Sequence, residues 1–158
     1  MSSAKTWTTE QVNALLKDSP WVKVAGIDMD GILRGKVMSR EKFLASTSSG
    51  FGYCSVIFGW DMHDKCYTTP TDFSSEANGN ADVWAKVDLN SYRPLPWENN
   101  MPLFLCTFHD PRLPDHPSLS MCPRSLLAKV CDRGERDLGA IAYAGVEYEF
   151  FNYQGKVL

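Results

Sequence analysis

Apolar and polar residues at the start of the chain follow a helical pattern and then an alternating one. A short helix that Thr8 or Thr9 can cap is predicted to run to Asp18, with its apolar residues on one face. Pro20 follows at once and ends that helix. Within residues 21–38 the pattern alternates on both sides of a turn that ends in glycine, which predicts a β-hairpin.

The middle of the chain carries short apolar runs between stretches of small and polar residues. Ser39 is predicted to cap a short helix, and residues 46–52 are predicted to form a loop of small residues. Residues 53–60 combine aromatic and β-branched side chains, which predicts a buried strand. Two further strands are predicted at 83–89 and 103–108.

The last part of the chain predicts a helix and a strand after a proline-rich linker at 109–123. Pro123 suits the first position of a helix, and 141–151 is predicted to be a strand. The residues predicted to form the buried face of that helix are Leu126, Leu127, Val130 and Cys131. The whole order indicates an α+β fold, in which the first hundred or so residues form a mixed sheet of β-grasp type with a helix packed across it.

The predicted strand at 141–151 would leave an apolar edge. Only a turn and three residues, 156–158, follow it. Natural domains normally cover such an edge, so we expect the chain to be an interrupted part of a longer one. The alternative is a frayed tail in a complete small protein.

Charge and composition narrow the classes of partner. The 158 residues carry 16 basic and 19 acidic side chains, for a net charge of -3, and no long basic run. This balance argues against a nucleic acid or an anionic membrane surface as partner. No apolar stretch is long enough to cross a membrane. The five cysteines have no regular spacing and no C-x-x-C pair, which predicts reduced thiols and a cytoplasmic location.

Two groups of residues could carry chemistry. In a strand, Glu147 and Glu149 point to the same side, roughly 6.5–7 Å apart, and each could hold one divalent cation of a two-metal site. An ordinary half-exposed strand with its charges in water has the same pattern. The second group consists of Asp61, His63, Asp64 and Cys66. Its spacing matches no standard zinc pattern, so a solvated loop is favoured over an independent metal site.

Residues 145–151, Gly-Val-Glu-Tyr-Glu-Phe-Phe, resemble a motif of the glutamine synthetase family. That motif is the Gly-x-Glu-x-Glu-Phe-Phe strand that opens the family's catalytic domain, and its two glutamates each bind one catalytic divalent cation. Four more stretches resemble the family in the same order: residues 21–38, Phe58-Gly59-Trp60-Asp61, residues 104–111 and Cys122-Pro123-Arg124. The resemblance therefore covers nearly the whole chain, from about residue 21 to residue 151.

The resemblance implies a fold and a domain organisation. Residues 1–19 would be an N-terminal helix, residues 20–115 a β-grasp domain, and residues 116–158 the incomplete start of a glutamine synthetase catalytic domain. The fold class is then α+β, a β-grasp domain followed by the first helix and strand of a truncated catalytic domain. In the family, such subunits assemble with one another into rings.

The implied activity is ATP-dependent ligation of glutamate with ammonia or an amine, which gives a γ-glutamyl amide. Magnesium or manganese and ATP would serve the full-length enzyme, with Glu147 and Glu149 as metal ligands. This chain lacks most of the catalytic domain, so it is expected to bind neither cofactor and to be inactive alone. The alternative is a non-catalytic β-grasp module that assembles with full-length homologous subunits.

One departure from the family pattern concerns the amine. Typical members carry Phe-Asp-Gly-Ser-Ser in a loop where the Asp helps to receive ammonium. The aligned residues here are Gly-Tyr-Cys-Ser-Val at 52–56, so Tyr53 stands in place of that Asp. The chain is thus similar to the branch that contains γ-glutamylpolyamine ligases and fungal glutamine synthetase-like proteins, in which the amine acceptor differs.

Overall fold

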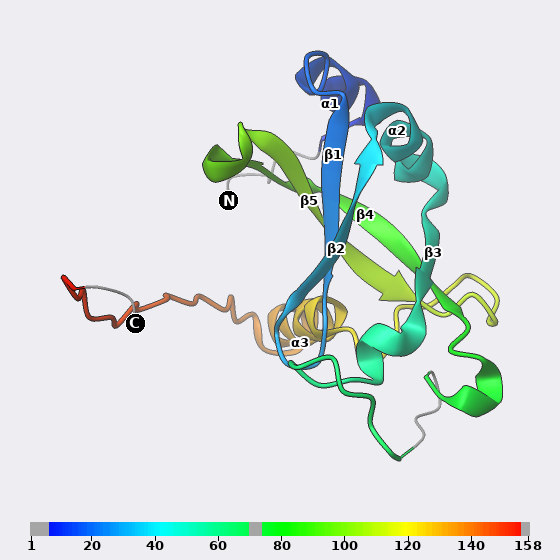
Figure 1. Ribbon diagram of the computed structural model, residues 1–158. Helices are drawn as coiled ribbons and strands as arrows, with labels where there is room; N and C mark the ends of the chain where they lie inside the picture. The colour runs from blue at the N-terminus through cyan, green and yellow to red at the C-terminus, as the bar shows by residue number, and fades with distance from the viewer. Residues whose placement is uncertain (1–6, 70–73, 156–158) are drawn as a thin grey trace.

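The computed structural model describes residues 7–69 and 74–155 and shows a mixed five-stranded sheet with helices (Figure 1). The strands are β1 (Trp21–Ile27), β2 (Leu33–Ser39), β3 (Phe51–Cys54), β4 (Asp82–Leu95) and β5 (Met101–His109). Their order in the sheet is β2-β1-β5-β4-β3. The central pair, β1 and β5, is parallel, and every other pair is antiparallel. The α+β class predicted from the sequence is confirmed.

The helices are α1 (Thr9–Leu15), α2 (Arg40–Ser49) and α3 (Pro123–Leu138), and short 3-10 turns include η1 (Ser55–Phe58), η2 (Glu76–Asn78) and η3 (Pro96–Glu98). Both predicted N-terminal caps are confirmed. The Thr8 hydroxyl accepts a hydrogen bond from the Gln11 N–H, while the Ser39 hydroxyl accepts one from the Lys42 N–H. Each cap satisfies one of the donors that the first turn of a helix leaves unpaired.

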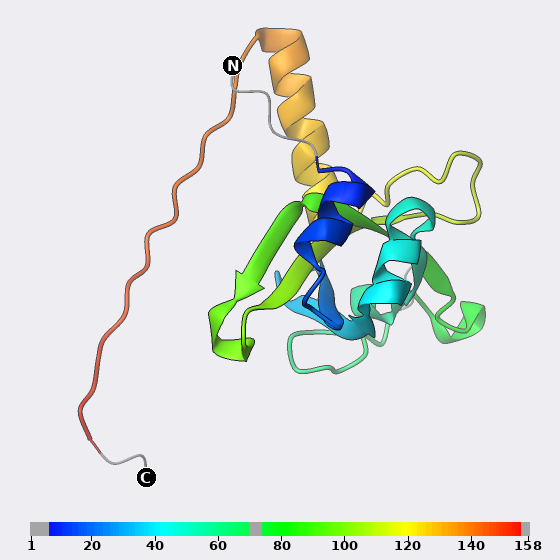
Figure 2. The same cartoon turned by 90° about the horizontal axis from the view of Figure 1, so that it is seen from above.

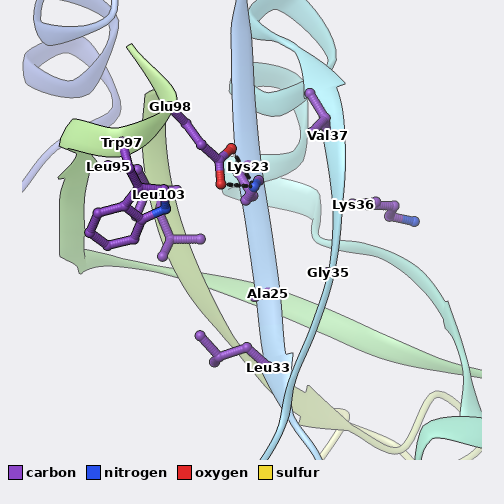
Figure 3. A pocket seen from close by; sticks show the side chains of 10 residues that line it. All are labelled: Lys23, Ala25, Leu33, Gly35, Lys36, Val37, Leu95, Trp97, Glu98 and Leu103. Atoms are coloured by element: carbon purple, nitrogen blue, oxygen red, sulfur yellow. Dashed lines mark hydrogen bonds and ion pairs between the residues drawn. The ribbon is translucent and has the colours of Figure 1, made fainter. Parts of the chain in front are cut away.

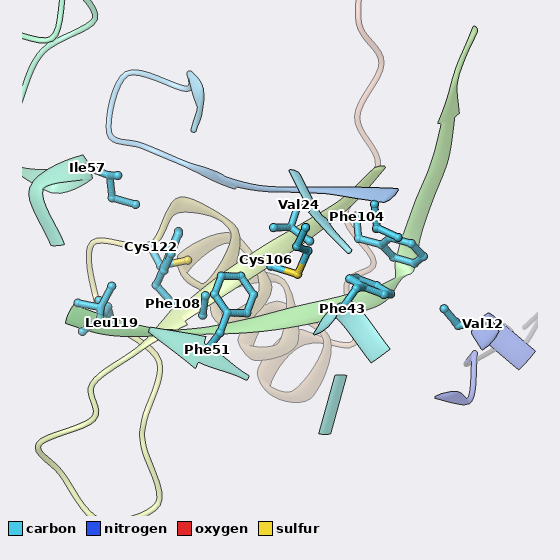
Figure 4. Close-up of a cluster of buried hydrophobic side chains, with 14 of the residues drawn as sticks. Val12, Val24, Phe43, Phe51, Ile57, Phe104, Cys106, Phe108, Leu119 and Cys122 are labelled. Carbon is cyan, nitrogen blue, oxygen red and sulfur yellow. The ribbon is translucent and has the colours of Figure 1, made fainter. Parts of the chain in front are cut away.

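The main core lies between one face of the sheet and the helices α1 and α2 (Figures 1 and 4). Phe104 on β5 is fully buried, and its ring centroid lies 4.7 Å from that of Phe43 on α2. Phe108 extends the same core, with the Phe58 ring edge-on at 5.3 Å. A Cβ atom at Gly26 would lie 2.1 Å from the Phe108 ring, so only glycine fits there.

The predicted hairpin at 21–38 is confirmed as β1 and β2, with Trp21 opposite Ser39 and Ile27 opposite Leu33. Its turn is closed by Asp28, whose side-chain Oδ1 accepts hydrogen bonds from the N–H groups of Asp30 and Ile32. An aspartate that binds the backbone two and four residues ahead fixes such a turn. The loose alternation in the sequence was therefore sufficient to locate both strands.

Two predictions for residues 46–60 are wrong. Residues 46–49 continue α2 instead of forming a loop, and their hydroxyl side chains bond back to helix carbonyls: Ser46 donates to the Lys42 carbonyl at 2.8 Å. The predicted strand at 53–60 is only β3, which ends at Cys54. Its apolar continuation is the 3-10 turn η1, since buried strands and buried helical turns share the same apolar pattern.

β4 is longer than the predicted strand at 83–89 and runs on to Leu95. An irregularity between Asp88 and Arg93 interrupts its pairing with β5. Beyond it Pro94 lies opposite Pro102, a site where proline is tolerated next to a bulge. Pro94 and Pro102 therefore lie within the paired strands, whereas Pro96 opens the turn η3 between them.

The predictions for the C-terminal part are correct for α3 but wrong for its buried face and for the strand after it. α3 begins at Pro123 as predicted, yet Leu126, Leu127 and Val130 are exposed, and Leu127 retains 65% of its accessible surface. Residues 140–155 extend away from the sheet without strand pairing (Figure 2). A strand needs a neighbour for its backbone groups, and the described residues offer none to this segment. No helix in the described ranges is long and apolar enough to span a membrane.

Candidate functional site

The two glutamates that the sequence singled out, Glu147 and Glu149, lie in the exposed segment that follows α3. In residues 7–69 and 74–155 no group of three or more His, Cys, Asp or Glu side chains is placed to hold a metal ion. The structure thus keeps the two carboxylates free of partners from the sheet. The two carboxylates are hard oxygen donors two residues apart, the kind of ligand that divalent cations prefer.

The second sequence cluster, Asp61, His63, Asp64 and Cys66, forms a closed turn. The Asp61 carboxylate accepts hydrogen bonds from the N–H groups of His63 at 2.8 Å and Lys65 at 3.0 Å. These backbone donors lower the pKa of Asp61. Trp60 and Cys66 pair across the base of the turn. The Asp61 carboxylate therefore holds the loop closed. The side chains of His63, Asp64 and Cys66 are exposed, which confirms the prediction of a solvated loop.

Arg34 joins this turn to the β1–β2 hairpin and was missed at the sequence level. Its Nε donates to Oδ2 of Asp28 at 2.8 Å, and its Nη2 donates to the Asp61 carbonyl at 3.1 Å. Its Nη1 pairs with the Asp64 carboxylate, and the guanidinium lies 5.1 Å from the Trp60 ring centroid. We call Asp28, Arg34, Trp60, Asp61 and Asp64 the Arg34 cluster. The sequence signal for it was Asp28 in an Asx-type turn six residues before an arginine.

Tyr53, at the position where the resemblance places the ammonium-binding Asp, is half buried against aromatic side chains. Its ring meets Phe108 edge-on at 5.4 Å, and the Lys36 ammonium lies 5.1 Å from its centroid. Burial raises the pKa of the Tyr53 phenol, which therefore stays neutral near pH 7. The next residue, Cys54, is exposed, and Ser55 is fully buried. The structure therefore places a neutral aromatic side chain at the position where the resemblance implies an aspartate.

Arg124 attaches the start of α3 to the sheet. Its Nη2 donates to Oδ2 of Asp88 on β4 at 2.5 Å, and both side chains are about two-thirds buried. Cys122, two residues earlier, belongs to the main core. The Cys-Pro-Arg stretch at 122–124, which resembles the family, therefore attaches the start of α3 to the sheet and the core.

The face of the sheet opposite the main core carries an open groove of about 380 Å³ (Figure 3). Leu33, Val37 and Trp97 form apolar walls, and Trp97 is 77% exposed. The Lys23 ammonium and the Glu98 carboxylate pair with each other at 2.5 Å beside the groove. Because these two charges satisfy one another, the groove presents a mainly apolar surface. Sequence reasoning did not find it, since its residues come from four separate segments.

Comparison with known proteins identifies the group to which this arrangement belongs. No family model matches the chain. Type-1 glutamine synthetase 2 of Dictyostelium discoideum is 42% identical over 141 residues, which cover 87% of this chain and 26% of the relative. Glutamate--isopropylamine ligase of a Pseudomonas species is 30% identical over 131 residues, which cover 82% of this chain and 28% of the relative. The chain belongs to the glutamine synthetase-like family.

Solved structures agree with this membership at the level of the fold. A GmaS/ADP complex superposes with a TM-score of 0.60 at 18% identity, over 84% of this chain and 26% of that one. GmaS without ligand gives a TM-score of 0.59 at 20% identity, over 84% of this chain and 27% of that one. The glutamine synthetase-like chain thus spans about a quarter of the length of these relatives.

The five cysteines of this glutamine synthetase-like chain are free thiols in different environments, which predicts an order of reactivity. Cys54 and Cys66 are exposed, whereas Cys106 is buried, and burial raises its thiol pKa to about 12. A maleimide at neutral pH is therefore expected to modify the first two quickly and Cys106 only after unfolding. Peptide mass spectrometry over a time course measures this order. In denaturant all five should react alike, and fast labelling of Cys106 in the folded chain would contradict the burial described above.

Proposed function

We propose that this chain is part of a glutamate–amine ligase, an ATP-dependent enzyme that joins the side-chain carboxylate of glutamate to ammonia or an amine. The observation that carries the proposal is the 42% identity over 87% of the chain to a type-1 glutamine synthetase. The similarity to a glutamate--isopropylamine ligase supports the same reaction class. Because the chain matches about a quarter of each relative, the complete reaction would need segments that these residues do not include.

In this proposal residues 20–115 form a β-grasp unit, preceded by the helix-bearing segment 1–19. The sheet order β2-β1-β5-β4-β3 with its parallel central pair supports that assignment. Residues 116–158 would begin the catalytic unit. The exposed apolar face of α3 fits this organisation, since such a face normally packs against further protein.

Glu147 and Glu149 are proposed as ligands of two divalent cations, magnesium or manganese. Carboxylate oxygens are the donors that these cations prefer, and both side chains are exposed and available. Such cations, when bound with ATP, neutralise the oxygens of the phosphoryl group that is transferred. The described residues supply no third ligand, so this chain alone would hold cations weakly. The two glutamates would serve as ligands only when further donors complete each site.

We further propose that the acceptor is an amine other than ammonia. Tyr53 supports this choice because a neutral, half-buried phenol offers no negative charge to gather ammonium. An alkyl amine would instead find apolar ring surface at this position. The isopropylamine relative acts on an acceptor of that kind by its name.

A chimera tests the metal proposal directly. The aligned residues of this chain replace the matched 141 residues of the Dictyostelium relative. Glu147→Gln or Glu149→Gln is expected to lower magnesium-dependent phosphate release on the order of a hundredfold, because each removes a charged ligand of a cation that neutralises the phosphoryl oxygens. Tyr148→Phe is the matched control and should change the rate by no more than about a factor of two. Full activity of either glutamine variant would overturn the assignment, whereas amide formation by the unfused 158-residue chain would overturn its expected inactivity.

A second candidate is a non-catalytic module that assembles with full-length subunits. The exposed side chains Leu126, Leu127 and Val130 on α3 favour it, because a monomer seldom leaves such a stripe in water. Size-exclusion chromatography of this chain mixed with the Dictyostelium relative separates the outcomes. Co-elution in a fixed ratio supports the module, and separate elution at every ratio rules it out.

A further inference from the structure

β2 is an edge strand that leaves one side of its backbone open to a further strand. It pairs with β1 on one side and, in the described ranges, with no strand on the other. The opposite edge strand, β3, has four residues against seven in β2. Arg34, near the start of β2, is held by the 61–66 turn, whereas the next three residues, 35–37, are exposed. β2 therefore offers the longer edge to a pairing segment.

The two faces of β2 differ in chemistry. Leu33 and Val37 line the apolar groove, and each is about half exposed. Lys36 points away from the groove (Figure 3), and its ammonium lies 4.7 Å from the ring centroid of Phe51. No carboxylate in the described part of the chain pairs with Lys36. A strand added to this edge would thus meet apolar side chains on one face and a positive charge on the other.

The segment at 141–151 has the complementary pattern. Three apolar side chains at alternate positions retain 73–82% of their accessible surface: Val146, Tyr148 and Phe150. Glu147 and Glu149 lie between them and are also exposed. In a strand, the apolar side chains would share one face and the two carboxylates the other. The segment has no strand pairing and extends away from its own sheet (Figure 2).

One alignment of the two strands satisfies both faces at once. With Tyr148 and its apolar neighbours toward the groove, they would lie beside Leu33 and Val37 and cover apolar surface there. The two carboxylates would then lie on the same face as the Lys36 ammonium. A shift by one residue would instead put the carboxylates on the apolar groove and the rings beside the ammonium. The alternation in both strands therefore selects how they align.

We propose that residues 141–151 of one copy add as a strand to the outer edge of β2 in a second copy of this chain. α3 has 16 residues, a length of roughly 24 Å, and carries the segment away from its own sheet. The edge that the segment meets therefore belongs to another copy. Because each copy has one such segment and one such edge, two copies exchange both and close into a two-fold dimer. This association goes beyond the proposed ligase reaction and does not depend on it.

Sedimentation of the whole 158-residue chain tests the exchange. Buffer without divalent cations keeps the test separate from the proposed metal role of the two glutamates. A concentration-dependent equilibrium between monomer and dimer is expected, in which amides of 141–151 and of β2 gain hydrogen-exchange protection together. A monomer at every concentration up to about 1 mM would overturn the proposal. Protection of 141–151 in the monomer would also overturn it, since the pairing would then lie within one chain.

A proline within the segment tests the backbone pairing. Tyr148→Pro is expected to abolish the dimer, because proline removes a backbone donor and interrupts a paired strand. Tyr153→Pro, outside the paired segment, is the matched control and should keep the Kd within about a factor of two. Both tyrosines are more than 80% exposed, so neither variant should alter the folded sheet. A dimer that persists in Tyr148→Pro would overturn the proposal, and dissociation by Leu127→Lys alone would place the contact on α3 instead.

Charge reversal tests how the two strands align. Lys36→Glu is expected to raise the Kd of the dimer about tenfold, because it gathers three carboxylates on one face. Adding Glu147→Lys and Glu149→Lys to that chain should restore the Kd to within about threefold of the original. Lys86→Glu reverses an exposed lysine on the interior strand β4 and, as the matched control, should change the Kd by no more than about a factor of two. A triple variant that stays as weak as Lys36→Glu would overturn the proposal.

Discussion

Phe104→Ala is expected to lower the free energy of unfolding by about 3–5 kcal/mol. Phe104 has no solvent exposure and lies on β5, the middle strand of the sheet. Its ring contacts Phe43 from α2 at 4.7 Å and Tyr92 from β4 at 5.5 Å. Truncation would thus leave a cavity bordered by a helix and a strand, which cannot collapse around it without moving the sheet. The total free energy of unfolding of a domain of this size is roughly 5–15 kcal/mol, so this substitution would remove a large part of it.

Urea denaturation followed by circular dichroism measures this effect. Trp97→Ala is the matched control, because it removes a larger aromatic ring that is 77% exposed on the opposite face of the sheet. Its free energy of unfolding should change by no more than about 0.5 kcal/mol. Phe104→Leu offers a milder variant, expected to fold and to lose less than the alanine substitution. Equal destabilisation by Phe104→Ala and Trp97→Ala would contradict the described core.

The sequence located elements well where local chemistry decides them. The hairpin at 21–38 and the caps at Thr8 and Ser39 follow from side chains that bond to backbone a few residues away. Such contacts depend on spacing along the chain alone. The start of α3 at Pro123 belongs to the same class, since proline fits the first helical position for a local reason.

Predictions failed where the outcome depends on distant partners. The apolar pattern at 53–60 fits either a strand or a helical turn. In the structure residues 55–58 form the turn η1, from which Ile57 and Phe58 enter the core. The same holds for α3, whose apolar stripe at Leu126, Leu127 and Val130 was predicted to be buried but has no covering surface in the described residues. Periodicity identifies the face of an element, whereas the element that covers this face comes from elsewhere.

The candidate site shows the same division. The glutamates at 147 and 149 were found from spacing and resemblance, but their further ligands depend on residues beyond any local pattern. The Arg34 cluster was missed because it joins the β1–β2 turn to a loop nearly thirty residues later, at Asp61 and Asp64. Replacing Arg34 is expected to have the second large effect on the stability of this protein.

Arg34→Met is expected to lower the free energy of unfolding by about 2–3 kcal/mol. The Asp28 carboxylate is only 1% exposed, and Arg34, itself 15% exposed, is its cationic partner. Methionine keeps part of the apolar stem of Arg34 but leaves a buried anion without its counter-charge. The N–H groups of Asp30 and Ile32 still donate to the Asp28 carboxylate and compensate for part of this loss. The expected destabilisation is therefore smaller than for a buried carboxylate with no partner at all.

The partners of Arg34 provide the matched control. Asp64 pairs with the same guanidinium but is 63% exposed, so Asp64→Asn should cost less than about 1 kcal/mol. Arg34→Lys keeps the charge but cannot reach Asp28, the Asp61 carbonyl and Asp64 together, and it should fall between the two. Thermal and urea unfolding of the three variants give this order. If Asp64→Asn destabilised the chain as much as Arg34→Met, the exposed ion pair and not the buried Asp28 would hold the hairpin to the 61–66 turn.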